Sequence, residues 1–156
     1  METTHSKRDA LDFYIPAKGF KESAKCIHVS PYADGREGLI FLPMQTLIGF
    51  SLELYFKALL AHAGVDEGVL RREYGHDLQK LFEDCTEAGL PEITRLNEVV
   101  EATSGSHSDY TYRYFSRNRS YTAMGLGTTF PVLDHLDEAV DRAIGASASS
   151  GKSPGH

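Results

Sequence analysis

The stretch FLPMQTLIGFSLELYFKALLAHAG, residues 41–64, decides the fold. It carries no turn signal between Pro43 and Gly64, and almost every side chain is apolar or small. Proline suits the first turn of a helix, where its missing N–H costs nothing, and glycine is common just after a helix ends. Because the apolar residues lie on every side, the stretch predicts a long helix buried at the centre of a helical bundle.

One face of this helix breaks the apolar pattern. Thr46, Gly49, Glu53 and Lys57 follow one another at spacings of three and four residues, and we name these four residues the polar seam. A charge in apolar surroundings must be paired, or its pKa shifts until the group is neutral. Two interpretations follow. Glu53 and Lys57 form an internal ion pair that fixes the helix register, or they form the floor of a polar pocket.

Composition restricts the class of protein. At 156 residues the chain is long enough for one domain with a full core. Its net charge of −6 argues against a broad nucleic-acid surface but leaves room for a local basic site. Cys26 and Cys85 show no metal-binding spacing, so we expect two buried free thiols and no metal or cofactor. No signal sequence is recognised, and charges within the apolar helix argue against a membrane span, which predicts a cytoplasmic protein.

The rest of the chain also favours helices. The pattern predicts an all-α bundle of four or five helices over residues 9–146, with disordered tails at 1–8 and 147–156. Helix start and stop signals place the further helices at about 16–29, 66–72, 77–89, 91–104 and 131–146. Residues 110–121 alternate aromatic and polar side chains, and with no partner strand they are expected to form an extended loop across the bundle.

A histidine lies between two predicted helices, in Tyr74-Gly-His76-Asp77-Leu78. One interpretation is structural: the imidazole caps the helix that follows or hydrogen-bonds the Glu53 carboxylate. The other is functional, because histidine is the side chain that titrates near neutral pH without perturbation and so suits general acid–base catalysis.

Three segments together resemble one family. SLELYFKALL at 51–60, YGHDLQKL at 74–81 and YRY at 112–114 are similar, in this order and spacing, to the HEPN superfamily. The resemblance covers about residues 13–144. It implies a helical bundle of prokaryotic defence or toxin–antitoxin type, a homodimer, and a possible antitoxin or nucleotidyltransferase partner. It also implies a metal-independent ribonuclease in those members that carry an arginine followed, four to six residues later, by a histidine.

This chain departs from that nuclease pattern. Arg117 is followed by a polar residue in the expected late region, but no histidine follows it. Arg71 precedes His76 at the right spacing, although it lies in the earlier junction. His107 precedes Arg113, which is the reverse order. The sequence therefore favours a non-catalytic binding or interaction protein. The alternative is a metal-independent ribonuclease that uses Arg71 or Arg72 with His76, or one that recruits Arg117.

Aromatic and arginine side chains interleave in residues 110–121, a pattern that suits single-stranded RNA or a nucleotide. The candidates for binding are Tyr112, Arg113, Tyr114 and Arg117. The alternative is that the tyrosines cover the bundle while the arginines face solvent. The preferred interpretation is intermediate: Arg113 reaches Glu53, so that Glu53, Lys57, His76 and Arg113 form one polar network.

Overall fold

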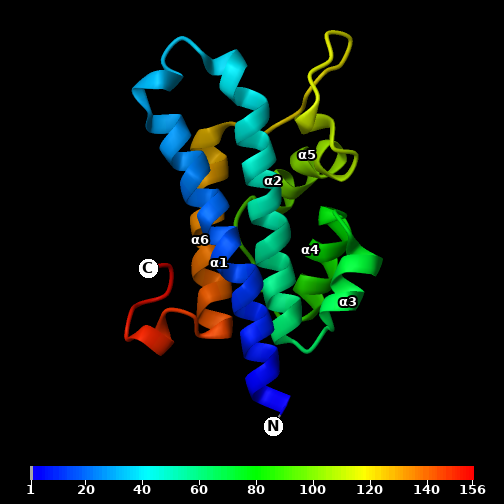
Figure 1. Ribbon diagram of the computed structural model, residues 1–156, viewed down its shortest axis with the longest axis vertical. Coiled ribbons are helices and arrows are strands. Elements are labelled where there is room, and N and C mark those ends of the chain that lie inside the picture. The colour runs from blue at the N-terminus through cyan, green and yellow to red at the C-terminus, as the bar shows by residue number, and fades with distance from the viewer. Residues whose placement is uncertain (1) are drawn as a thin grey trace.

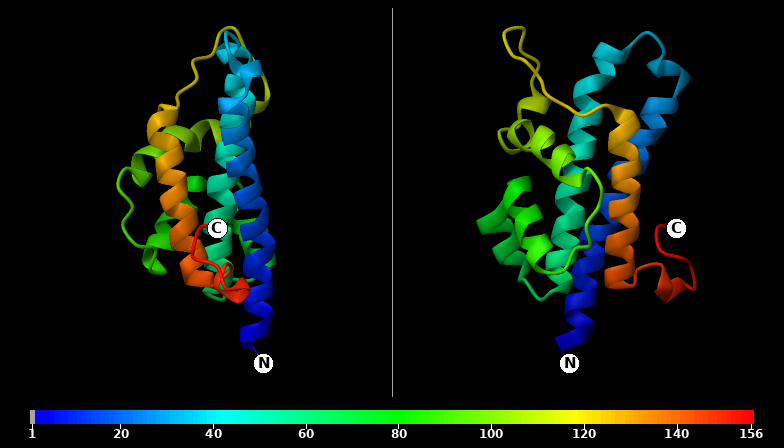
Figure 2. Two further views of the ribbon diagram at one scale, coloured as in Figure 1. Left: turned by 90° about the vertical axis from the view of Figure 1, so that its left-hand side faces the viewer. Right: turned by 180° about the vertical axis from the view of Figure 1, so that it is seen from behind.

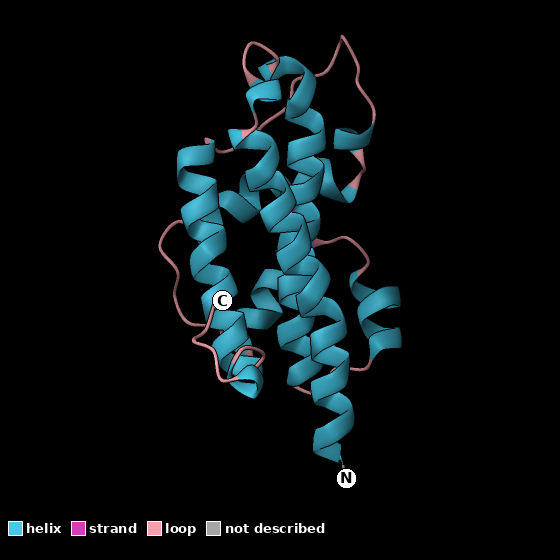
Figure 3. Ribbon diagram, turned by 60° about the vertical axis from the view of Figure 1, so that its left-hand side comes forward, coloured by secondary structure: helices cyan, strands magenta, loops and turns pink. Residues whose placement is uncertain are grey.

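The protein is described by a computed structural model that covers residues 2–156, with side chains from residue 9 onward. Over these residues the chain is helical with no strand (Figure 3), which confirms the predicted all-α bundle. Its α-helices are α1 (Glu2–Val29), α2 (Glu37–His62), α3 (Glu67–Val69), α4 (Leu78–Glu87), α5 (Leu96–Ser108) and α6 (Leu126–Ile144).

Helix α2 is the centre of the bundle. It runs antiparallel to α1, with α6 on one side and α4 and α5 on the other (Figures 1 and 2), and it contacts all four. Ile48, Leu52, Tyr55 and Phe56 are fully buried in the core. By length and composition alone α2 is apolar enough to cross a membrane, but a bundle's core helix passes the same test, and half of its most apolar window is buried here.

Prolines lie inside three helices rather than at their starts, which corrects the predicted boundaries. Pro16, Pro43 and Pro131 are interior to α1, α2 and α6, so each helix begins earlier than expected. A proline frees one carbonyl oxygen four residues earlier. The residues that carry the freed carbonyls are exposed to solvent, so water can donate a hydrogen bond to each freed oxygen. They are Asp12, Leu39 and Gly127.

Two predictions around α5 were wrong. The helix begins at Leu96 rather than Pro91, after Arg95 with a left-handed φ of 68°, and it continues through the Ser-Gly-Ser run that was expected to end it. Residues 110–121 are not a single extended loop. They begin with the 3₁₀ turn η3 (Thr111–Arg113), which packs on α2 and α5, and only the later residues project from the bundle (Figure 2).

Both predicted tails have a defined course over the described residues. Residues 2–8 belong to α1. The segment 147–156 folds back onto α6, where the Asp141 carboxylate accepts hydrogen bonds from the backbone N–H of Ser147 and from that of Gly155, each at 2.7 Å. The helical region is therefore longer than 9–146 at its N-terminal end, and the C-terminal segment is held by a buried carboxylate.

A buried polar cluster that was not among the predicted sites joins α1 to α6. Asp137 Oδ2 accepts from Lys21 Nζ at 2.7 Å, and Asp137 Oδ1 accepts from the Tyr14 hydroxyl at 2.7 Å. Lys21 and Asp137 are both buried. The cluster was recognisable as lysines on α1 and aspartates on α6 that each recur at spacings of three and four, namely Lys18, Lys21, Lys25, Asp134, Asp137 and Asp141.

Candidate functional site

The polar seam lies where α2 meets α5, η3 and the connection between α3 and α4. Glu53 is only 3% exposed. Its Oε1 atom accepts a hydrogen bond from Lys57 Nζ at 2.6 Å, and the same ammonium donates to the Gly75 carbonyl at 2.7 Å. The ion pair predicted from the i,i+4 spacing is therefore present, and it ties α2 to the turn that precedes α4.

The second Glu53 oxygen is shared by two histidines. His76 Nδ1 lies 2.8 Å and His107 Nε2 lies 2.7 Å from Oε2. Because an ionised carboxylate can only accept hydrogen bonds, each facing ring nitrogen must carry a proton. The His107 side chain is 4% exposed, whereas that of His76 is 32% exposed. In the neutral His76 ring, Nε2 is then the unprotonated nitrogen, on the side of the ring away from Glu53.

These partners keep the Glu53 carboxylate ionised. Burial alone would raise the pKa of Glu53, but the hydrogen bonds from His107, Lys57 and His76 outweigh it and hold that pKa at about 2. At neutral pH the group is a buried negative charge that orients both imidazole rings. The predicted hydrogen bond between His76 and Glu53 is present.

His107 is the residue of this network that sequence reasoning missed. Its ring packs against Gly49, where an added Cβ would lie 2.4 Å from His107 Nδ1. The glycine at the middle of the seam therefore makes room for the imidazole. A glycine within an otherwise apolar helix was the available signal, but nothing in the sequence indicated which side chain would fill the space.

Arg113 does not contact Glu53, contrary to the preferred interpretation. Its guanidinium lies over the rings of Tyr110, at 4.2 Å from the ring centroid, and of Phe50, at 5.3 Å. Tyr110 also makes an edge contact with His76, at 4.9 Å between ring centroids. Arg113 is exposed, and its guanidinium makes no ion pair or hydrogen bond with any residue that the structure describes. The Tyr110 ring is therefore in contact both with His76 and with an arginine that has no carboxylate partner among the described residues.

The other candidates from the sequence are dispersed. Arg71 lies in the π-helical turn η2 (Leu70–Tyr74), where it pairs with Glu67 at 2.7 Å and faces solvent. Tyr112 is buried and donates its hydroxyl to the Thr122 carbonyl at 2.6 Å, so it supports the loop. Tyr114 and Arg117 are exposed on the projecting loop. Of the candidate arginines, only Arg113 is connected to His76, through the Tyr110 ring that both side chains contact.

Glu53, His76 and His107 also have the ligand types of a metal site, with donor atoms within 4.8 Å of one another. The carboxylate oxygen lies 2.7–2.8 Å from both nitrogens, which are hydrogen-bond lengths. In addition, the Lys57 ammonium already balances the Glu53 charge. We therefore interpret the three residues as a hydrogen-bonded network.

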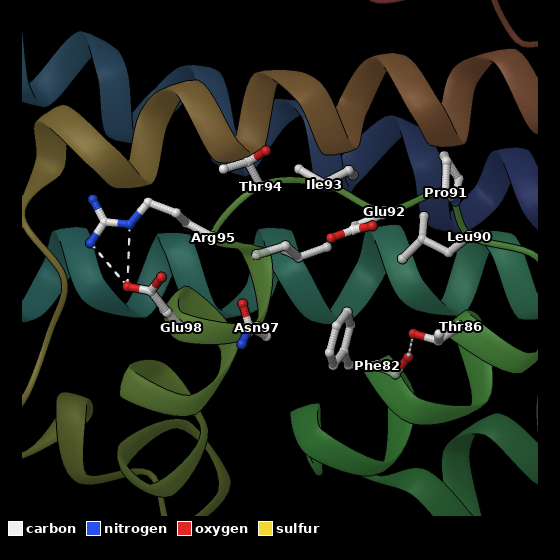
Figure 4. A pocket seen from close by; sticks show the side chains of 11 residues that line it. Phe82, Thr86, Leu90, Pro91, Glu92, Ile93, Thr94, Arg95, Asn97 and Glu98 are labelled. Carbon is white, nitrogen blue, oxygen red and sulfur yellow. Dashed lines mark hydrogen bonds and ion pairs between the residues drawn. The ribbon is translucent and has the colours of Figure 1, made fainter.

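A further pocket of about 610 Å³ lies at the connection between α4 and α5 (Figure 4). Its lining cation is already paired, because Arg95 Nη2 donates to Glu98 at 2.9 Å and Arg95 Nη1 donates to Thr128 at 3.1 Å. This pocket therefore offers no free cation, unlike the surface around Arg113.

Comparisons with protein-family models, with curated proteins and with solved structures found no match to this chain. The assignment of function consequently rests on the residues and on the geometry described above.

Proposed function

We propose that the protein is a HEPN-like binding protein that takes single-stranded RNA on the surface formed by Arg113, Tyr110 and His76. The observation that carries the proposal is the Arg113 guanidinium, stacked on two aromatic rings and without a carboxylate partner among the described residues. Stacking leaves the N–H edges of a guanidinium available, and a phosphate can accept two of them.

Local charge supports RNA as the ligand. The chain as a whole carries a net charge of −6, yet residues 110–133 contain three arginines and no acidic residue. Exposed Tyr114 and Phe115 lie next to Arg113 in the chain, so aromatic faces and cationic groups occur together. That combination is typical of proteins that bind unpaired nucleotides by stacking and phosphate contact.

The test is the affinity for a fluorescently labelled single-stranded RNA, measured by anisotropy at low salt. Arg113→Ala is expected to weaken binding at least tenfold, because one charge-assisted bidentate contact contributes roughly 1.5–3 kcal/mol. Arg71→Ala removes the same charge from an exposed site on η2 and is the matched control. Equal affinity of the Arg113→Ala and Arg71→Ala proteins would reject Arg113 as the contact.

A second candidate function is ribonuclease activity, and the hydrogen bond between Glu53 and His76 favours it. In the neutral ring, Nε2 of His76 can accept the proton of an RNA 2′-hydroxyl while Glu53 holds the opposite nitrogen. The 2′-oxygen then forms a bond to phosphorus, the bond to the 5′-oxygen breaks, and the leaving oxygen takes a proton from water, while His76 Nε2 returns the proton that it accepted to solvent. The products are a 2′,3′-cyclic phosphate and a free 5′-hydroxyl, with Arg113 stabilising the charge on the phosphoryl oxygens.

Cleavage in the presence of EDTA distinguishes the two functions. The nuclease requires a cyclic-phosphate product from wild-type protein, and loss of that product in His76→Ala while circular dichroism shows intact helices. Binding without cleavage by wild-type protein would leave the binding function alone. A homodimer and a nucleotidyltransferase or other antitoxin partner remain predictions of the HEPN resemblance, and light scattering and the identity of the neighbouring gene test them.

A further inference from the structure

An apolar groove of about 620 Å³ lies beside Arg113, where the first half of α2 meets η3 and the loop that follows. Leu39, Leu42 and Leu47 of α2 line one part, and Phe115 lines another. Leu39 is 64% exposed and Phe115 is 74% exposed, so two large apolar side chains face solvent here. Its volume is within the range usual for small-ligand sites.

The groove is continuous with the proposed RNA site. Arg113 lines the groove and also stacks on Tyr110, which contacts His76. Thr46 lines the groove and is the first residue of the polar seam. From Thr46 to Glu53 the distance along the α2 axis is about 10 Å, at ~1.5 Å per residue, and a few nucleotides can span it.

We propose that this groove holds an unpaired nucleobase of the RNA strand whose phosphate is bound by Arg113. The inference rests on the proposed function. A phosphate on the outer edge of Arg113 places its nucleoside within reach of the groove, because Arg113 is one of the groove's lining residues. Phe115 supplies an exposed ring for stacking, and any nucleobase can use it because every base has an aromatic face.

Charge complementarity favours a nucleotide over an apolar protein segment. The lining residues include a cation, Arg113, and no acidic side chain. Arg117 follows two residues after Phe115 and is also exposed. An apolar helix docked here would cover an unpaired guanidinium at an energetic cost, whereas a nucleotide pairs that charge with its phosphate.

The experiment compares two oligoribonucleotides of the same length and phosphate number, one with bases and one with abasic riboses at its central positions. Wild-type protein is expected to bind the base-containing RNA roughly 5- to 150-fold more tightly, the range for one stacked base. Phe115→Ala is expected to lower the affinity for the base-containing RNA to that for the abasic RNA, and to leave the affinity for the abasic RNA unchanged. Arg113→Ala is expected to weaken both, and Ile15→Ala, which removes an exposed apolar side chain from α1, is expected to weaken neither.

The outcomes separate this inference from the proposed function. No binding of either oligonucleotide rejects the RNA function and the base site with it. Binding with equal affinity for both oligonucleotides rejects the base site alone. If Phe115→Ala changes the molecular mass measured by light scattering, while the difference between the two oligonucleotides stays as in wild type, the groove is an interface between copies of this chain and the inference is overturned.

Discussion

Replacing Gly49 with alanine tests how the two histidines are held. The added Cβ would lie 2.4 Å from Nδ1 and 3.0 Å from Cγ of His107. The imidazole cannot move aside freely, because it is buried, packs edge-on against Phe50 at 5.1 Å and hydrogen-bonds Glu53 at 2.7 Å. We expect the ring to be displaced and the hydrogen bond to Glu53 to be lost.

The magnitude follows from three effects. Overpacking a buried site costs about 1–3 kcal/mol. Losing a hydrogen bond to a charged group costs about 1.5–3 kcal/mol. Alanine is about 1 kcal/mol better than glycine inside a helix, which partly offsets both. The Gly49→Ala protein should therefore be roughly 1.5–5 kcal/mol less stable than wild type, measured by urea unfolding.

A double-mutant cycle isolates the clash. In His107→Ala the ring is absent, so adding Gly49→Ala should cause no further loss and should restore about 1 kcal/mol of helix propensity. Gly19→Ala is the control, because that helical glycine is exposed, has no atom within 4 Å of its added Cβ and should stabilise the protein. A Gly49→Ala protein as stable as wild type, or strictly additive effects in the double mutant, would refute the packing described.

Three further predictions concern the Asp137 ion pair, the Glu53 carboxylate and the two cysteines. Asp137→Ala should cost about 3 kcal/mol in urea unfolding, the lower end of the range for breaking a buried ion pair, because Lys21 loses its buried partner and keeps only the more exposed carboxylates of Asp134 and Glu22; a loss below 1 kcal/mol would contradict that pairing. The pKa of Glu53 is about 2 in the folded protein and about 4.5 in the unfolded chain. The ionised carboxylate therefore stabilises the folded state by about 3 kcal/mol, an effect that is complete above pH 4.5 and is lost as pH falls towards 2. The groups that face the carboxylate and lower its pKa are Lys57, His76 and His107. The free energy of unfolding, measured between pH 5 and pH 2.5, should therefore fall less steeply with pH in Glu53→Gln than in wild type. Equal slopes in the two proteins would contradict this. Exposed Cys26 should react quickly with a thiol reagent, whereas buried Cys85, whose pKa burial raises, should react only on unfolding; two fast thiols would contradict the buried position.

The sequence predicted the parts of the site that follow from helical spacing. Glu53 and Lys57 are four residues apart on one helix, so their pairing depends on local geometry alone. For His76 the sequence left two structural interpretations open, a cap on the following helix and a hydrogen bond to Glu53, and the structure shows the second. The residues that make these contacts lie either within α2, as Glu53 and Lys57 do, or just before a recognisable helix start, as His76 does before α4.

Contacts set by tertiary packing escaped prediction. His107 reaches Glu53 only because α5 continues past its Ser-Gly-Ser run and crosses α2 at Gly49. With His107 in that place, Arg113 is left to stack on Tyr110. Cys26 was expected to be buried but is exposed, because the buried face of α1 carries Ala17, Lys21 and Ala24, and Cys26 lies two residues after Ala24 and off that face. Helix propensity does not determine such crossings, because packing against neighbouring helices overrides it.

The most direct test of the RNA site is the salt dependence of binding. The logarithm of the affinity constant for single-stranded RNA is plotted against the logarithm of salt concentration for wild type, Arg113→Ala and Arg71→Ala. Each phosphate contact contributes about 0.7 to that slope. We expect a shallower slope for Arg113→Ala, by about that amount, and an unchanged slope for Arg71→Ala. The same slope in all three proteins would contradict the claim that Arg113 binds a phosphate.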